Sequence, residues 1–289
     1  MGLRSVTIGG VKLLISVEGG LAKRIKTLLP KGADTLHPPA IPPPGVLSML
    51  PGADPELVRR VNEIEWYHTI DLGSIVTRGA FDHRPLLSRY PLPERLDGKR
   101  VLDVATFDGF WALEFEKRGA SEVVAIDVDN FGQIDLAAPV RARLPRERLE
   151  GRRTGNGFRL AAEVLGSKVK REICSVYDLS PARLGMFDFV YVSSLLLHLK
   201  CPMKALESIL SVTRGEAMIV DYFDPRLPSG LIFAVEPNEL CVWWAFSLGA
   251  LQQMIRSAGF SRVDLLTKFA IGHLGQPADI WHAAFRAVP

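Results

Sequence analysis

Two carboxylates, Asp103 and Asp127, stand at the ends of two predicted strands, where side chains of a parallel sheet meet a ligand. Residues 101–104 are apolar apart from Asp103, and residues 123–126 form a second apolar run that Asp127 ends. Between the two runs lie a turn with Gly109 and an amphipathic stretch. This pattern is typical of a strand, a helix and a second, parallel strand. An open parallel sheet binds its ligand at the carboxyl ends of the strands, so both carboxylates are predicted to line a binding site.

The turn after Asp103 discriminates between cofactors. A dinucleotide needs G-x-G-x-x-G, because its pyrophosphate must approach bare backbone. Here Ala105 and Phe107 stand where the first two glycines would be, and Asp108 would repel a phosphate. Asp127 can accept hydrogen bonds from both hydroxyls of a ribose. The pattern therefore favours an adenosine cofactor without phosphate, and the alternative is a strand–helix–strand unit that has only a packing role.

Composition indicates a soluble globular enzyme. The 289 residues are 47% hydrophobic and 23% charged, with a formal net charge of +3 that permits a polyanionic partner without requiring one. The densest basic run, residues 141–153, is interpreted either as a solvated helix end or as a contact with nucleic acid. No pattern of a signal peptide or of a membrane span is present, so a cytoplasmic location is expected.

The cysteines and histidines indicate neither a disulfide framework nor a metal site. Cys174, Cys201 and Cys241 are widely spaced without a C-x-x-C pair, and no H-E-x-x-H spacing occurs. No metal is therefore expected.

Two regions are expected along the chain, an N-terminal extension over residues 1–65 and a main domain over residues 66–289. The extension should contain a short strand and a basic helix before residue 35, a proline-rich linker at 37–45, and a helix capped by Asp54 with Pro55 in its first turn. Residues 69–98 are expected to be rich in loops.

The main domain alternates strands and helices. About seven strands with interposed helices predict a doubly wound, seven-stranded, mostly parallel α/β sheet. Further strands are expected at residues 172–179, 187–194, 216–223, 261–267 and 280–287, with helices over 133–144, over 156–166, from Pro202, and from Ser247 to Gly259.

The order of these strands, together with Asp103, Asp127 and the pair Tyr177-Asp178, resembles the class I S-adenosylmethionine (SAM)-dependent methyltransferases. Within that superfamily the chain is similar to the tRNA wobble-uridine carboxymethyltransferase-like group over residues 66–289. The residues that carry this closer similarity are the segment before the core, residues 195–202 (LLLHLKCP) and residues 243–260.

Two departures from that group concern its carboxylated SAM. Leu197 stands where the tRNA enzyme has a tyrosine, and Trp281 aligns with an arginine. A carboxylate against leucine and tryptophan would be desolvated without partners. These two departures from the group therefore favour methyl transfer from ordinary SAM.

By resemblance, the loop after Asp103 cradles the methionine part of SAM and Asp127 binds the ribose. Val128 would pack on adenine, Asp178 would accept from the adenine amino group unless it caps a helix, and Ser193 would reach the cofactor's amino group unless it makes only a strand-end hydrogen bond. The complete expected cofactor set is Asp103, Ala105, Thr106, Phe107, Gly109, Asp127, Val128, Tyr177, Asp178 and Ser193.

A general base is needed only for a hydroxyl or a protonated amine acceptor. His198 and Asp221 are the candidates, and the alternative for His198 is a buried histidine bonded to backbone. The expected acceptor-binding residues are Arg78, Phe81 and His83 in a lid before the core, and the pair Trp243 and Trp244, whose alternative role is core packing.

The sequence is thus predicted to encode a SAM-dependent methyltransferase acting on an oxygen or nitrogen of a small molecule. A tRNA-modifying (carboxy)methyltransferase is one alternative. A non-catalytic SAM-binding protein is another, motivated by Ala105 and Phe107 in the cofactor loop.

Overall fold

The computed structural model describes residues 3–8, 11–16, 45–151, 153–235 and 241–289. The short strand expected near the N-terminus is a hairpin of β1 (Leu3–Ile8) and β2 (Val11–Ser16). The basic helix and nearly all of the proline-rich linker expected before residue 45 lie outside the described residues.

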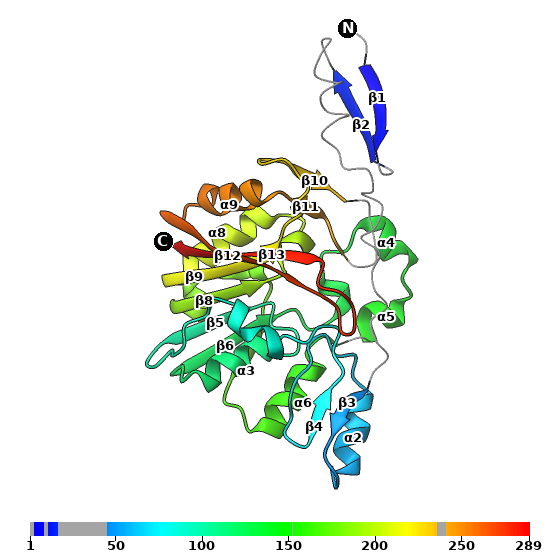
Figure 1. Cartoon of the computed structure of the whole chain (residues 1–289), viewed down its shortest axis with the longest axis vertical. Helices are drawn as coiled ribbons and strands as arrows, with labels where there is room; N and C mark the ends of the chain where they lie inside the picture. Colours follow the sequence, from blue (N-terminus) through cyan, green and yellow to red (C-terminus); the bar gives the residue numbers. More distant parts are fainter. Residues whose placement is uncertain (1–2, 9–10, 17–44, 152, 236–240) are drawn as a thin grey trace.

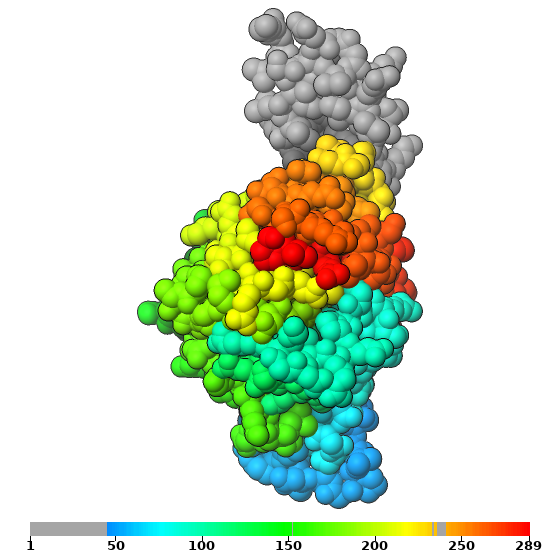
Figure 2. All heavy atoms as spheres, turned by 90° about the vertical axis from the view of Figure 1, so that its left-hand side faces the viewer, coloured from blue at the N-terminus to red at the C-terminus, as the bar shows by residue number. Residues whose placement is uncertain are grey.

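A seven-stranded sheet in the order β12-β13-β9-β8-β5-β6-β7 forms the centre of the chain (Figure 1). All its neighbouring strands are parallel except that β13 runs antiparallel to both β9 and β12. Figure 2 shows the red C-terminal residues between orange and yellow parts of the chain, as this order requires. The predicted fold class is confirmed. The strands are β5 (Arg100–Val104), β6 (Glu122–Asp127), β7 (Lys170–Ile173), β8 (Phe187–Ser193), β9 (Thr213–Tyr222), β12 (Arg262–Ile271) and β13 (Ile280–Val288).

Helices cover both faces of the sheet because successive strand residues project to opposite sides. Val190 and Val192 of β8 pack in the core on one face, and Phe189 and Tyr191 pack in the core on the other. The first face carries α7 (Pro181–Leu184), α8 (Pro202–Val212) and α9 (Leu248–Ser257). The second carries α2 (Pro55–Asn62), α3 (Phe110–Lys117) and α6 (Asn156–Leu165), while α4 (Ala138–Arg143) and α5 (Arg146–Gly151) lie beside a smaller third cluster.

The segment before the sheet packs on the second face. It contains an antiparallel pair, β3 (Val46–Met49) with β4 (Ile75–Thr77), and the 3₁₀ helix η1 (Arg84–Arg89), in an otherwise irregular path. Val61 and Trp66 are buried in the same core as the sheet residues. The division of the chain at residue 65 stays a prediction.

The predicted helix boundaries follow their capping residues. Asp54 accepts a hydrogen bond from the amide of Glu56 at 3.0 Å, and Ser247 accepts one from the amide of Ala250 at 3.2 Å. Gly166 ends α6 in the left-handed conformation.

Two predicted elements are shorter than expected. The strand predicted for residues 172–179 ends at Ile173, because the Ser175 hydroxyl accepts from the Tyr177 amide and turns the chain into the 3₁₀ helix η3 (Val176–Asp178). The helix predicted for residues 133–144 is confined to α4, preceded by η2 (Phe131–Gln133). A proline has no amide hydrogen and belongs in the first turn, so Pro139 sets the start of α4.

Candidate functional site

The carboxyl ends of the parallel strands meet at one edge, as expected for the ligand-binding edge of such a sheet. The loop of residues 105–109, which follows β5 and is called the cofactor loop below, is joined to the end of β6. The Thr106 amide donates to the Ile126 carbonyl at 3.0 Å, and the Phe107 amide donates to Asp127 Oδ2 at 2.8 Å. The segment 66–83 and the loop between β12 and β13 also touch at this edge, where the Leu274 amide donates to the Ala80 carbonyl at 2.7 Å.

The cofactor loop has the backbone of a glycine-rich loop although two of the glycines are absent. Ala105, Phe107 and Gly109 have φ angles of 61°, 48° and 86°, all in the left-handed region that favours glycine. Each non-glycine residue in this conformation lowers the stability of the folded protein by roughly 1–2 kcal/mol. The loop therefore keeps its glycine-type shape although alanine and phenylalanine stand at positions 105 and 107, and this shape lowers the stability of the protein.

Glycine at position 105 is accordingly expected to stabilise the protein. Ala105→Gly removes the strained Cβ, and we expect a gain of about 1 kcal/mol in the free energy of unfolding, reduced by the greater entropy of glycine in the unfolded chain. Thermal unfolding measures the effect. Ala162→Gly, inside α6, is the matched control and should destabilise by about 1 kcal/mol. A fall in stability for both variants would contradict the assignment of strain.

Asp127 is oriented by two backbone amides. Its Oδ2 accepts from Phe107 at 2.8 Å and its Oδ1 accepts from Val128 at 2.7 Å. Each carboxylate oxygen keeps a second lone pair, so the group can still accept from two vicinal hydroxyls. Burial raises the pKa of Asp127 to about 6. The arrangement fits the ribose of an adenosine cofactor.

Asp103 lies beneath the cofactor loop. It is 1% exposed, accepts from the Ala112 amide at 3.1 Å, and has its pKa raised to about 7 by burial. Its carboxyl therefore joins β5 to the first turn of α3, and Thr106 is buried beside it in the loop. A direct contact of either side chain with the cofactor stays a prediction.

Asp108 is a site residue that the sequence did not reveal. Its Oδ2 accepts from the amides of Tyr67 at 2.6 Å and His68 at 2.9 Å, which attaches the segment before the sheet to the cofactor loop. The fit is close, since a Cβ on Gly157 would lie 2.4 Å from Asp108 Oδ1. The sequence shows only that residue 108 is charged. Its partners are main-chain amides, and no sequence pattern indicates them.

Aromatic rings cover the cofactor loop. The Tyr67 ring lies 5.3 Å from that of Phe107 and 5.1 Å from that of Phe81, which in turn lies 4.2 Å from that of His273. Tyr67, which was not predicted, thus joins Phe81 to the cofactor loop, and the contact of Phe81 with an acceptor stays a prediction.

Two other predicted acceptor residues have internal partners. His83 is buried, its Nδ1 lies 2.9 Å from the Tyr90 hydroxyl, and burial lowers its pKa to about 3. Arg78 Nη2 donates to the Val46 carbonyl at 3.3 Å. Their contact with an acceptor stays a prediction.

The turn after β8 is organised by Asp221. The carboxylate is fully buried, and its Oδ2 accepts from the amides of Leu195 at 3.0 Å and Leu196 at 2.8 Å. Burial raises its pKa to about 6. This turn carries His198, whose Nδ1 lies 3.2 Å from the Cys241 carbonyl oxygen. Asp221 therefore has a clear structural role, while its catalytic role stays a prediction.

At the end of β8, Ser193 is half-buried and Ser194 adopts a φ of 50°. The Ser194 hydroxyl lies 2.9 Å from Nε2 of His282, a buried histidine on β13. This contact joins the central strand to the antiparallel strand directly beside the site.

Tyr177 and the two tryptophans bind backbone and side chains around Asp135. The Tyr177 hydroxyl donates to Asp135 Oδ2 at 2.5 Å, and Trp243 Nε1 donates to the Asp135 carbonyl at 2.6 Å. Trp244 Nε1 donates to the Leu199 carbonyl at 2.7 Å. Both indole N–H groups are therefore bonded to backbone carbonyls, and a contact of these tryptophans with an acceptor stays a prediction. Asp178 is exposed, next to this network.

The basic run 141–153 makes several internal contacts. Arg141 donates to the carbonyls of Gly132 and Ile134, Arg146 pairs with Glu150, and Arg153 pairs with Asp129. A contact of this run with nucleic acid stays a prediction.

Among the described residues, no group of three or more histidine, cysteine, aspartate or glutamate side chains could hold a metal ion. None of the described helices is both long enough and apolar enough to cross a membrane.

No family model matches the chain. A magnesium-protoporphyrin O-methyltransferase from Rhodobacter capsulatus is 27% identical over 195 residues, which cover 62% of this chain and 70% of that protein. The solved N-terminal domain of EvdMO1, in the presence of SAH and D-fucose, aligns over 81% of this chain and 95% of its own with a TM-score of 0.53 at 16% identity. The structure of that domain with SAH bound gives the same values. The chain is thus similar in sequence to a methyltransferase and has the doubly wound α/β fold of a domain solved with SAH bound.

Proposed function

We propose that this methyltransferase transfers the methyl group of SAM to an oxygen or nitrogen of a small-molecule acceptor. The observation that carries the proposal is the Asp127 carboxylate, which the Phe107 and Val128 amides orient at the end of β6 beside the cofactor loop. In this reading Asp127 binds the ribose, Val128 packs on adenine, and the cofactor loop with Ser193 holds the methionine part.

A small organic acceptor is supported by the relative from Rhodobacter capsulatus, whose name describes O-methylation of magnesium protoporphyrin. The rings of Tyr67 and Phe81 offer the flat apolar contact that a planar acceptor would use. Trp243 and Trp244 are further candidates for this contact.

Ordinary SAM, rather than its carboxylated form, is supported by the residues at the two departures from the tRNA enzymes. Leu197 is buried and apolar, and Trp281 is 39% exposed with its ring 6.3 Å from that of Phe223. Neither side chain carries a positive charge to pair with an extra carboxylate. Tighter binding of the carboxylated cofactor in a competitive titration would instead favour the tRNA-modifying alternative.

The bound cofactor supplies an electrophilic methyl group on a sulfonium. The protein's own contribution is to orient the acceptor in line with that methyl group, and such positioning supplies much of the rate. The rings of Tyr67 and Phe81 lie against each other, and Tyr67 contacts Phe107 in the cofactor loop. His198 is the candidate group that removes a proton from a hydroxyl acceptor.

Calorimetric titration with SAM, S-adenosylhomocysteine and NAD tests the cofactor assignment. We expect binding of the first two and no binding of NAD, because the Phe107 side chain stands in the loop where a pyrophosphate would need bare backbone. Binding of NAD without binding of SAM would overturn the proposal.

The role of His198 is tested by His198→Asn. If the imidazole removes the acceptor's proton, turnover should fall by about 10²-fold or more while SAM affinity and melting temperature stay nearly unchanged. If its contact with the Cys241 carbonyl is only structural, stability and SAM affinity should fall together. A variant equal to wild type in turnover, affinity and stability would exclude both roles.

A further inference from the structure

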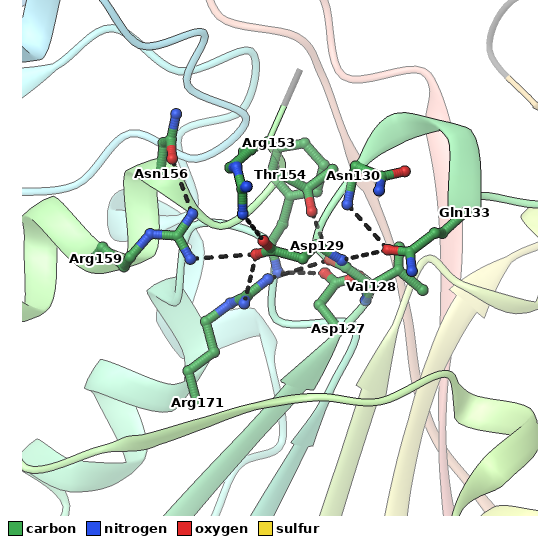
Figure 3. Close-up of polar contacts among 11 residues, drawn as sticks. Asp127, Val128, Asp129, Asn130, Gln133, Arg153, Thr154, Asn156, Arg159 and Arg171 are labelled. Atoms are coloured by element: carbon green, nitrogen blue, oxygen red, sulfur yellow. Dashed lines mark hydrogen bonds and ion pairs between the residues drawn. The ribbon is translucent and has the colours of Figure 1, made fainter. Parts of the chain in front are cut away.

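Three arginines surround a single carboxylate directly beyond the proposed ribose site (Figure 3). The carboxylate belongs to Asp129, which is buried and lies two residues after Asp127. Arg153 Nη1 lies 2.7 Å from its Oδ2, while Nη1 of Arg159 and Nη1 of Arg171 lie 3.2 and 3.0 Å from its Oδ1. One cation would neutralise this carboxylate, so the convergence of three calls for an additional role.

Arg171 differs from the other two arginines in its burial. Its side chain is 7% exposed, compared with 63% for Arg153 and 46% for Arg159. Exposed ion pairs contribute little, whereas a buried guanidinium is retained only where its charge and its donors are compensated. Gly155 provides the room, because a Cβ there would stand 2.5 Å from the guanidinium carbon of Arg171. The surroundings of Arg171 thus leave room for a guanidinium whose Nη1 and Nη2 have partners, while its buried Nε has none among the described residues.

The register of the sheet directs Arg171 toward the ribose site. In the β6–β7 pair, Arg171 is opposite Ala125 and Ile173 is opposite Asp127. Residues that pair across strands, and alternate residues along a strand, project from the same face. Arg171 and Asp127 thus share a face, and the long arginine side chain reaches along it past the end of β6, as Figure 3 shows.

At the end of β6 the guanidinium holds the backbone that orients Asp127. Arg171 Nη2 donates to the Val128 carbonyl at 3.1 Å, an oxygen that also accepts from the Thr154 hydroxyl at 2.6 Å. The amide of the same residue, Val128, donates to Asp127 Oδ1. By binding the Val128 carbonyl and the Asp129 carboxylate, Arg171 restricts the turn that orients the Asp127 side chain.

We propose that Arg171 is the positioning residue of the ribose site, holding the Val128–Asp129 backbone and placing a positive charge beside Asp127 so that the Asp127 carboxylate meets the cofactor ionised and correctly oriented. This inference rests on the proposed role of Asp127 in binding the ribose.

The charge matters because Asp127 has two acidic neighbours. Asp103 faces it from β5 and Asp129 follows it in the chain, so both oppose its ionisation, and Arg171 on β7 favours it. Burial raises the pKa of Asp127 to about 6 even with Arg171 present. Removing the positive charge should raise this pKa further and protonate the carboxyl closer to neutral pH.

The test measures SAM affinity by calorimetry from about pH 5 to about pH 8, the range in which such a group titrates. In the wild type, affinity should fall as the pH drops through the pKa of Asp127. Arg171→Gln should weaken binding roughly 5- to 30-fold at the upper end of this range and move the midpoint up by roughly one pH unit. Arg171→Lys keeps the positive charge but loses the planar guanidinium, which can bind two acceptors at once. It should therefore weaken SAM binding with little shift of the pH midpoint.

Arg100→Gln is the matched control. Arg100 also joins a carboxylate, that of Glu122, to backbone carbonyls, those of Leu184 at 2.8 Å and Met186 at 3.1 Å, but at the amino end of β5. The Arg100→Gln variant should have a lower melting temperature than the wild type, with the same SAM affinity and the same pH midpoint.

Arg171 variants that lose thermal stability but keep the wild-type affinity and midpoint would overturn the inference. If Asp127→Ala weakens binding while the Arg171 variants do not, the inference fails and the proposed ribose site stands. If the wild-type protein does not bind SAM, the proposed function itself fails.

Discussion

Replacing Asp127 with alanine is expected to weaken SAM binding by about 1–3 kcal/mol, roughly 5- to 150-fold. The reason is that two ribose hydroxyls would lose their acceptor inside a partly buried site. The Phe107 amide would also lose its partner at 2.8 Å, which loosens the cofactor loop. Calorimetric titration at neutral pH measures the effect.

Asp188→Ala is the control for this variant. Asp188 pairs with Arg214 at 2.6 Å near the amino end of β8, at the opposite edge of the sheet from the site. Its loss should leave SAM affinity unchanged. Equal affinity of Asp127→Ala and wild type would remove Asp127 from the cofactor site.

Asp108→Ala is expected to have the largest effect on stability. The carboxylate is 1% exposed, and its removal leaves the amides of Tyr67 and His68 without the partner that they have at 2.6 and 2.9 Å. Each buried donor that is left without a partner costs about 1–3 kcal/mol, so we expect a loss of roughly 2–6 kcal/mol in the free energy of unfolding. Chemical denaturation measures it.

The Asp108→Ala variant should also affect acceptor binding more than cofactor binding. Because Asp108 attaches the segment that carries Tyr67 and Phe81 to the cofactor loop, the Michaelis constant for the acceptor should rise more than that for SAM. Asp97→Ala, which removes an exposed partner of Arg95, should change stability by no more than about 0.5 kcal/mol. An Asp108 variant as stable as this control would show that the attachment is dispensable.

The residues that orient a predicted site were harder to predict than the site itself. Asp127 was found from the sequence because it ends an apolar run, a local signal. Asp108 and Arg171 carry no such signal, since the partners of Asp108 lie 40 and 41 residues away and Arg171 acts across a strand pair. His83 was predicted at the acceptor side because of its neighbours in sequence, and no local pattern indicated its hydrogen bond with the Tyr90 hydroxyl.

The sequence by itself determined the class of fold, the order of its elements, the cofactor loop and the carboxylate at the end of β6. Apolar periodicity, capping residues and the position of Asp127 are properties of short segments, and short segments can be interpreted without the rest of the chain. Only the tertiary structure decided that Ala105 and Phe107 keep a glycine-like backbone, that Asp108 joins the segment of Tyr67 and His68 to the cofactor loop, and that Arg171 binds the Val128 carbonyl. Each of these depends on contacts between segments distant in sequence, where burial and charge are set by packing rather than by neighbouring residues.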